Sequence, residues 1–256
     1  MMKTRILTAI LIILIVAFPV FYGSWPLELL ALFIVCAGAW EWMRILPGFS
    51  NWSWLLVVAI GGVLGARFVP GSWLFVLVAC VVLFLWGLPV FMERFSIVDA
   101  NSLVVFFVLF SLFYISMGEI IANHMYLWTI VFATYGSDTG AYFIGRAFGR
   151  HKMNPRISPK KSWEGFFGGV VSGAIISIAL SSLYWSDLNV TVNVLLCLLC
   201  PVFAELGDLC FSAIKRHFGI KDFSNLLPGH GGVLDRVDSL LINILVFGVL
   251  FHIFLI

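Results

Sequence analysis

The chain has 256 residues, of which 62% are hydrophobic and only 11% are charged. A soluble domain usually carries about a quarter charged residues, so this composition excludes an ordinary soluble protein and indicates an integral membrane protein. The formal net charge of +2 carries little information, and no nucleic-acid partner is expected. Long apolar runs without strict alternation favour membrane-spanning helices over a β-barrel.

The apolar runs predict an all-α fold, a polytopic bundle of nine helices that spans a lipid bilayer. Lys3 and Arg5 precede the first run as in a signal peptide, but no small-x-small cleavage site follows, so we expect a retained first helix. If that segment does not span, eight helices remain. The expected spans are 6–22, 26–43, 52–69, 72–91, 101–121, 125–145, 164–184, 190–213 and 233–255.

The distribution of charge divides the chain into two regions. Residues 1–124 have short connectors with few charges, and we interpret them as transmembrane scaffold helices. Residues 125–256 carry most of the polar sequence, and we interpret them as the catalytic region. Glu41 and Glu119 lie near span ends in the first region. Such carboxylates are chiefly snorkelling or helix-paired groups, and a contribution to a lipid-facing groove is the alternative.

Asp138 interrupts the sixth expected span. An aspartate at this depth costs roughly 2.5–3.5 kcal/mol on insertion scales, and an ionisable residue inside a span indicates a functional site. The neighbouring Gly136 and Gly140 allow a helix or a ligand to approach the backbone closely. The structural alternative is a carboxylate that Ser137 and Thr139, or a basic residue, satisfies by hydrogen bonding.

The main basic loop follows this span. Part of its charge is a topology signal, because cytoplasmic loops are rich in Lys and Arg. The loop also contains Ser158-Pro159-Lys160-Lys161 directly before Ser162, which we expect to cap the seventh helix. A helix N-terminus beside lysines suits an anion, and a triphosphate or an anionic lipid headgroup are the candidates. The basic residues of this loop are Arg146, Arg150, His151, Lys152, Arg156, Lys160 and Lys161.

Two helix faces carry further polar side chains. Asp235 and Asp238 are three residues apart at the start of the last helix and share a face. In the eighth span, three- and four-residue spacings put four polar residues on one face, so this face must meet protein interior or water. These four residues are Glu205, Asp208, Ser212 and Lys215.

The charge bias also predicts topology. Nine spans place the loops 146–163 and 215–232 on one side, together with twelve of the fifteen Lys and Arg residues. The positive-inside rule assigns this side to the cytoplasm, so the polar loops are expected there.

Residues 212–238 are unusually polar for this chain and combine basic side chains with aspartates, histidines and glycines. This set suits phosphate chemistry with Mg²⁺, which usually takes one or two carboxylates plus substrate phosphates and water. The glycines permit positive φ and a close approach of the backbone to a ligand. The sequence has no P-loop or Rossmann glycine pattern. These residues predict a membrane enzyme acting on a phosphorylated substrate, without selecting the substrate.

The same residues resemble the signature of the phosphatidate cytidylyltransferase family, also called CDP-diacylglycerol synthases. The signature reads S-x-apolar-K-R-x4-K-D-x-small-x2-apolar-P-x-H-G-G-apolar-x-D-R-apolar-D, and residues 212–238 match its fixed positions. Segments 137–142 and 158–165 are also similar to family motifs. The resemblance implies a nucleotidyltransferase of phospholipid biosynthesis that converts CTP and phosphatidic acid into CDP-diacylglycerol and pyrophosphate.

The resemblance implies roles for individual residues as well. Mg²⁺ is the implied cofactor, and the aspartates leave room for a second cation. Asp208 and Asp235 are the leading metal ligands, and Asp138 and Asp238 are further ligands. The catalytic residues would be Lys215, Lys221, Arg236 and Asp222, the last also a candidate ligand. The substrate-binding residues would be Ser158, Lys160, Lys161, Ser212, Arg216, His230, Gly231 and Gly232.

Other functions stay open at this point. A related enzyme could use another lipid phosphate, because lipid-facing helices carry no readable code. A CTP-dependent lipid kinase would release CDP in place of pyrophosphate. The pattern of CDP-alcohol phosphotransferases is absent from the sequence, and a transporter would move a solute without CTP. The expected location is a bacterial cytoplasmic membrane, by analogy, and a homodimer is an open expectation.

Overall fold

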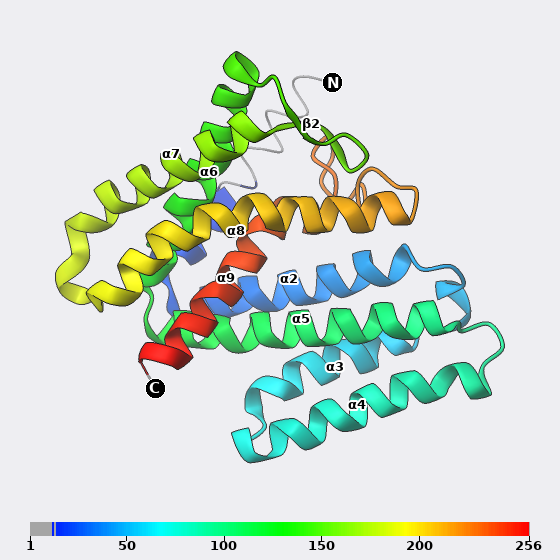
Figure 1. Ribbon diagram of the computed structural model, residues 1–256. Coiled ribbons are helices and arrows are strands. Elements are labelled where there is room, and N and C mark those ends of the chain that lie inside the picture. The colour runs from blue at the N-terminus through cyan, green and yellow to red at the C-terminus, as the bar shows by residue number, and fades with distance from the viewer. Residues whose placement is uncertain (1–11, 13, 256) are drawn as a thin grey trace. The chain divides into compact units, whose positions relative to one another are not determined.

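The computed structural model of the chain describes residue 12 and residues 14–255. Residues 6–11 and 13 of the expected first span, 6–22, lie outside the described residues, and residues 14–22 are helical, so the full span stays a prediction. Each of the other eight expected spans contains a helix, and Figure 1 labels these helices α2 to α9. They are α2 (Ser24–Arg44), α3 (Leu55–Phe68), α4 (Gly71–Phe91), α5 (Ile97–Ala122), α6 (Met125–Phe148), α7 (Trp163–Ser181), α8 (Val190–His217) and α9 (Leu234–Phe254).

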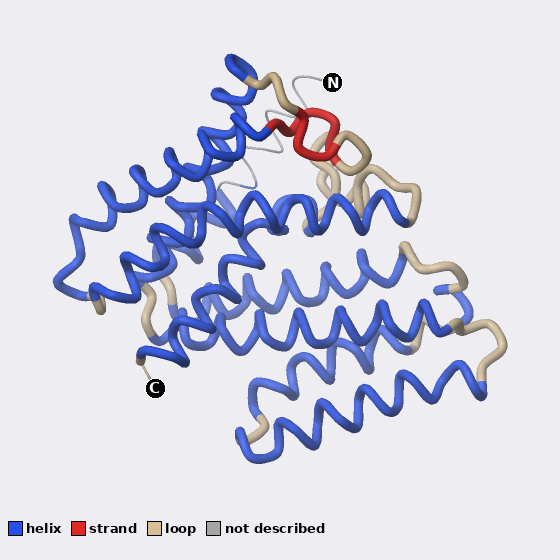
Figure 2. Tube along the Cα trace, viewed as in Figure 1, coloured by secondary structure: helices blue, strands red, loops and turns tan. Residues whose placement is uncertain are grey.

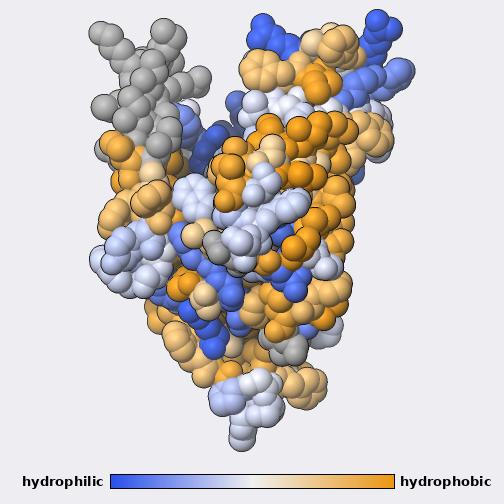
Figure 3. Space-filling model, turned by 90° about the vertical axis from the view of Figure 1, so that its left-hand side faces the viewer, coloured by the Kyte–Doolittle hydropathy of each residue, from blue (hydrophilic) through white to orange (hydrophobic). Residues whose placement is uncertain are grey.

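The helices differ in whether their length and hydropathy are sufficient to span a membrane. Among the described residues, six helices are long and apolar enough to cross a membrane, namely α2, α4, α5, α7 with the turn that follows it, α8 and α9. Helix α3 has only 14 residues, and α6 carries Asp138 and is not one of the six. The all-α membrane fold is therefore confirmed, whereas the count of nine spans is not. Figure 3 shows hydrophobic residues over much of one face, with hydrophilic residues among them.

The basic loop forms a small antiparallel hairpin that the sequence did not predict. Strands β1 (Lys152–Asn154) and β2 (Ser158–Ser162) pair Lys152 with Ser162 and Asn154 with Ser158 (red in Figure 2). The hairpin leads directly into α7. Ser162 is the N-cap of α7, and its Oγ accepts a hydrogen bond of 3.2 Å from the Gly165 amide. The predicted cap is thus confirmed, and it fixes where α7 begins.

The described residues group into two compact units. One contains the chain up to Gly118 together with segment 223–234, and the other contains 119–222 and 235–256. The linear division at residue 124 put segment 223–234 in the second region, but its contacts belong to the N-terminal unit. Within that unit, hydrogen bonds from Ser224 and Leu234 to Glu41 and the stacking of Phe223 on Trp42 join the segment to α2.

Aromatic packing holds the N-terminal unit together around Trp42 of α2. Its ring stacks on Phe223 at 6.3 Å and packs against Phe106 and Phe110 of α5. The Trp42 Nε1–H donates to the backbone oxygen and to Oγ of Ser102. The polar tip of a buried ring is thereby satisfied, so the ring adds apolar area without an unpaired donor.

The C-terminal unit consists of α6 to α9 and the hairpin. Helices α6 and α7 lie very close together. A Cβ placed on Gly136 of α6 would lie only 3.3 Å from the Cα of Gly173 in α7, and the two glycines permit this approach. Helix α9 is joined to α6 by a hydrogen bond of 2.7 Å from Asn243 Nδ2 to Thr134 Oγ1. It is joined to α8 by a bond of 3.0 Å from Ser239 Oγ to the carbonyl oxygen of Ala204.

A buried polar network around Asn193 of α8 offers a test of this packing. Its Oδ1 accepts from Thr129 Oγ1 at 2.7 Å, and its Nδ2 donates to Ser181 Oγ at 3.1 Å. Asn193→Ala would leave buried hydroxyls without these partners, so we expect a loss of about 1–2 kcal/mol of stability. Thermal unfolding in detergent measures this loss. Asn225→Ala, at an exposed position, is the matched control, and equal stability of the two variants would contradict the network's contribution.

Candidate functional site

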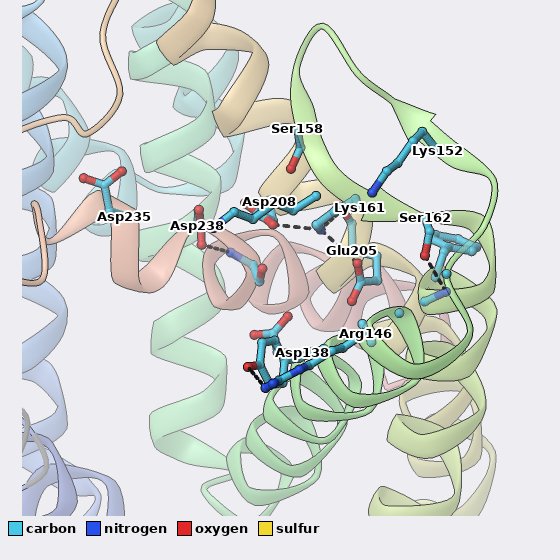
Figure 4. A pocket seen from close by; sticks show the side chains of 18 residues that line it. Asp138, Arg146, Lys152, Ser158, Lys161, Ser162, Glu205, Asp208, Asp235 and Asp238 are labelled. Carbon is cyan, nitrogen blue, oxygen red and sulfur yellow. Dashed lines mark hydrogen bonds and ion pairs between the residues drawn. The ribbon is translucent and has the colours of Figure 1, made fainter.

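The C-terminal unit contains a cavity of about 720 Å³. Its lining comes from α6, the hairpin, the first turn of α7, α8 and α9. Charged side chains of both signs are its main feature, and Figure 4 shows several of them turned toward one another. The charged residues that line it are Asp138, Arg146, Lys152, Lys160, Lys161, Glu205, Asp208, Asp235 and Asp238.

Five carboxylates line this cavity, and three helices contribute them. Asp138 comes from α6, Glu205 and Asp208 come from one face of α8, and Asp235 and Asp238 come from the first turns of α9. Asp208 and Asp235 are 27 positions apart in the sequence. The fold nevertheless brings them to the same cavity.

Lys161 is the central cation of the site. Its Nζ lies 2.8 Å from Glu205 Oε2 and 2.7 Å from Asp208 Oδ2, and it also donates to the Glu205 carbonyl oxygen at 3.2 Å. Burial alone would lower the pKa of Lys161, but the carboxylates of Glu205 and Asp208 outweigh it and raise this pKa above its ordinary value. The hairpin is therefore fixed to α8 by a charged lysine.

A second ion pair connects α8 with α9. Lys215 Nζ lies 2.7 Å from Asp235 Oδ1, and both side chains are buried. On the same face of α8, Ser212 Oγ donates to Asp208 Oδ1 at 3.3 Å. Asp238 accepts a hydrogen bond of 2.9 Å from the Ser239 amide. These contacts hold the aspartates in defined orientations before any ligand binds.

The other predicted site residues lie elsewhere. The Arg216 guanidinium donates hydrogen bonds to the backbone carbonyl oxygens of Ile157 and Ile220. Lys221 and Asp222 are exposed on the turn after α8, and Arg236 is exposed on α9. None of these four lines the cavity in the described part of the chain. His230, Gly231 and Gly232 belong to the N-terminal unit.

Several residues that line the cavity were not among the predicted site residues. Glu205 had a signal, because it shares the polar face of α8 with Asp208. Arg146 and Lys152 were recognised only as part of the basic loop. Ser239 lines the cavity beside Asp238 and had no sequence signal of its own.

The arrangement of possible metal ligands limits how the implied Mg²⁺ could bind. In the part of the chain that the structure describes, no three Asp, Glu, His or Cys side chains are grouped so that they could hold an ion. A closed cage made only of protein ligands therefore does not fit. Mg²⁺ bound by one or two carboxylates, with substrate phosphates and water completing the coordination, does fit an oxygen-rich, hydrated cavity.

The fold and the cavity together define a class. This is a polytopic helical membrane protein with an internal site of hard oxygen donors and cations, suited to phosphate-bearing ligands.

Comparison with known proteins narrows this class. The model of the cytidylyltransferase family matches residues 3–254. A phosphatidate cytidylyltransferase of Staphylococcus haemolyticus is 34% identical over 249 residues, which cover 93% of this chain and 94% of that protein. One of Staphylococcus aureus is 44% identical over 153 residues, 57% of each chain. One of Staphylococcus epidermidis is 33% identical over 249 residues. The chain belongs to the cytidylyltransferase family, and the resemblance found in residues 212–238 is confirmed.

The two ion pairs of Lys161 give a specific prediction. Lys161→Met would leave Glu205, which is only 2% exposed, without this cation and would release the hairpin from α8. Breaking a buried pair is strongly unfavourable, so we expect nucleotidyl transfer to fall at least about tenfold. Turnover of the purified protein in detergent measures this effect.

The neighbouring Lys160 provides the control. It lines the same cavity but is exposed, so Lys160→Met removes the same charge without breaking a buried pair. We expect a clearly smaller loss of turnover than for Lys161→Met. Equal losses would show that only the total positive charge matters and would contradict the anchoring role of Lys161.

Proposed function

We propose that this chain is a phosphatidate cytidylyltransferase, which converts CTP and phosphatidic acid into CDP-diacylglycerol and pyrophosphate. One observation carries the proposal: in a member of the cytidylyltransferase family, a single cavity gathers five carboxylates and four cations from separate elements. The names of relatives that match nearly the whole chain support the choice of substrates.

The proposed chemistry is a displacement at phosphorus. An oxygen of the lipid phosphate attacks the α-phosphorus of CTP, a new P–O bond forms, and the bond between the α- and β-phosphates breaks to release pyrophosphate. The attacking oxygen is already anionic, so no strong general base is required. The main barrier is the approach of one anion to another, which positioned cations lower.

The cavity residues supply these cations. Arg146, Lys152 and Lys160 line the cavity and would bind phosphate oxygens of the two substrates. Lys161 would hold the hairpin that carries Lys152 and Lys160 in place against α8. Lys215 would fix the orientation of Asp235 through their ion pair.

The metal assignment is part of the proposal. Asp208 and Asp235 would hold Mg²⁺ together with substrate phosphates and water, Asp138 and Asp238 are the alternative ligands, and Glu205 is kept in place by Lys161. When bound, Mg²⁺ would neutralise charge on the triphosphate and on the departing pyrophosphate. A second cation stays within the proposal, since five carboxylates exceed what one Mg²⁺ usually takes from protein.

We also propose that the cavity faces the cytoplasm from a bacterial inner membrane. The basic hairpin at its edge and the bias of Lys and Arg toward that side support this orientation. The relatives named above come from bacteria. A homodimer is proposed only as an assembly to be tested.

The direct test of the function uses purified protein in detergent with phosphatidic acid, Mg²⁺ and CTP labelled at the α-phosphate. We expect label in a CDP-lipid and one pyrophosphate released for each CDP-lipid formed. Release of CDP in place of pyrophosphate would identify a lipid kinase and contradict the proposal. Uptake of a solute by vesicles without CTP would indicate a transporter.

Asp235→Asn tests the metal assignment separately. The amide keeps the size of the side chain but removes the charge, so we expect turnover to fall at least about 100-fold while the protein still inserts into membranes. Glu93→Gln, at an exposed turn position, is a matched neutral control and should behave as the unmodified chain. Near-normal turnover of Asp235→Asn would refute the assignment of this ligand.

A further inference from the structure

Glu41 of α2 has an environment that the sequence did not predict. Its side chain is completely buried, with 0% exposure, in a mostly apolar helix. Among the ion pairs of the described residues, none involves Glu41. A buried carboxylate needs compensation, so the hydrogen bonds it accepts become decisive.

Three donors from segment 223–234 supply this compensation. Glu41 Oε1 accepts from Ser224 Oγ at 2.6 Å and from the Val233 amide at 2.8 Å, and Oε2 accepts from the Leu234 amide at 2.8 Å. Ser224 lies near the start of the segment, and Val233 and Leu234 end it. One carboxylate thus ties both ends of the segment to α2.

The two amides belong to the start of a helix. Leu234 is the first residue of α9, and the first amides of a helix have no partner within the helix. A negative charge at this position is favoured by the helix dipole. Glu41 therefore caps the N-terminus of α9, although it lies 193 positions before Leu234 in the sequence.

The carboxylate also explains one of the paired glycines. A Cβ on Gly232 would lie 2.5 Å from Glu41 Oε1 and 2.7 Å from Oε2, so any larger side chain requires the Glu41 carboxylate to move. Gly231 has a different reason, because its φ of 87° lies in the left-handed region that favours glycine. A change at Glu41 could therefore compensate a substitution of Gly232, but it could not compensate a substitution of Gly231.

Packing around Glu41 reinforces the attachment. The next residue, Trp42, stacks on Phe223 with an interplanar angle of 15°. One turn earlier on α2, Gly38 leaves room for the side chain of Leu234, whose Cδ2 would lie 3.1 Å from a Cβ at that position. Both ends of segment 223–234 are therefore held by apolar as well as polar contacts with α2.

We propose that Glu41 is a positioning residue for nucleotidyl transfer, because it determines where α9 begins. Asp235 follows Leu234 directly, and Asp238 lies one turn further along the same helix. If the first turn of α9 loosens, both aspartates lose their fixed place. The inference rests on the proposed metal role of Asp235 and Asp238, and it assigns a function to a residue outside the 212–238 signature.

Hydrogen exchange tests the attachment without any use of activity. In the full-length protein in detergent, the amides of Val233 and Leu234 should be protected. Glu41→Gln keeps the size of the side chain but loses one acceptor oxygen and the charge. We expect exchange at these amides to become about 5- to 30-fold faster in this variant. Unchanged protection would overturn the proposal, whatever the enzyme's substrates are.

The Mg²⁺ dependence of turnover tests the positioning role. Glu41→Gln should lower kcat and raise the Mg²⁺ concentration that gives half-maximal rate, each by roughly 5- to 30-fold, because the aspartates are less well ordered. Glu28→Gln is the matched control on the same helix, since its carboxylate pairs with Arg67 and accepts from Tyr114. It should lower thermal stability without changing the Mg²⁺ dependence. Equal Mg²⁺ shifts in both variants would overturn the proposal.

A compensation experiment provides the sharpest test. Gly232→Ala should impair turnover through its clash with the carboxylate, and adding Glu41→Asp, which withdraws that carboxylate by one methylene, should restore part of it. Gly231→Ala should also impair turnover, but Glu41→Asp should not restore it, because there the backbone is strained. Restoration of neither variant, or of both alike, would overturn the proposal. If Gly232→Ala does not fold, recovery of folded protein by Glu41→Asp is scored in the same way.

The experiments distinguish a failure of the proposed function from a failure of the positioning role of Glu41. If the unmodified chain forms no CDP-lipid, the function fails while the exchange result still decides the role of Glu41. If Asp235→Asn is inactive and Glu41→Gln has normal kcat and Mg²⁺ dependence, the metal assignment stands and the positioning role is wrong.

Discussion

A charged group buried in an apolar helix bundle must have a partner, and this constraint governs the structure of the site. Lys161 lies between Glu205 and Asp208, and Lys215 pairs with Asp235. The first pair joins the hairpin to α8, and the second joins α8 to α9. The cost of an unpaired charge in such surroundings is what makes these arrangements specific.

The same constraint explains how an apolar protein can present a polar cavity. The lysines balance several of the carboxylates within the unit, so the cavity holds a high density of charge without a large net charge. Arg146, Lys152 and Lys160 add positive charge at positions that are exposed. Anionic substrates would meet donors that are already oriented, which lowers the reorganisation needed during reaction.

Local sequence patterns predicted the elements well and the long-range contacts poorly. Apolar runs located eight helices, the spacing of Glu205 and Asp208 placed them on one face, and the Ser162 cap followed from its position before α7. These features depend on neighbours within one or two turns. The pairing of Lys161 with Glu205 of α8 depends on residues 44 positions apart. Glu41 shows the limit most clearly, because nothing near it in the sequence indicates that it caps a helix near the other end of the chain.

The central claim is that aspartates from α8 and α9 form one metal–nucleotide site. Binding of Mn²⁺ in place of Mg²⁺, followed by electron paramagnetic resonance of the purified protein with CTP, tests it most directly. The account predicts a CTP-dependent bound Mn²⁺ signal in the unmodified chain, and an affinity at least about tenfold weaker in both Asp208→Asn and Asp235→Asn. Unchanged Mn²⁺ affinity in either variant, with CTP still bound, would contradict a shared site.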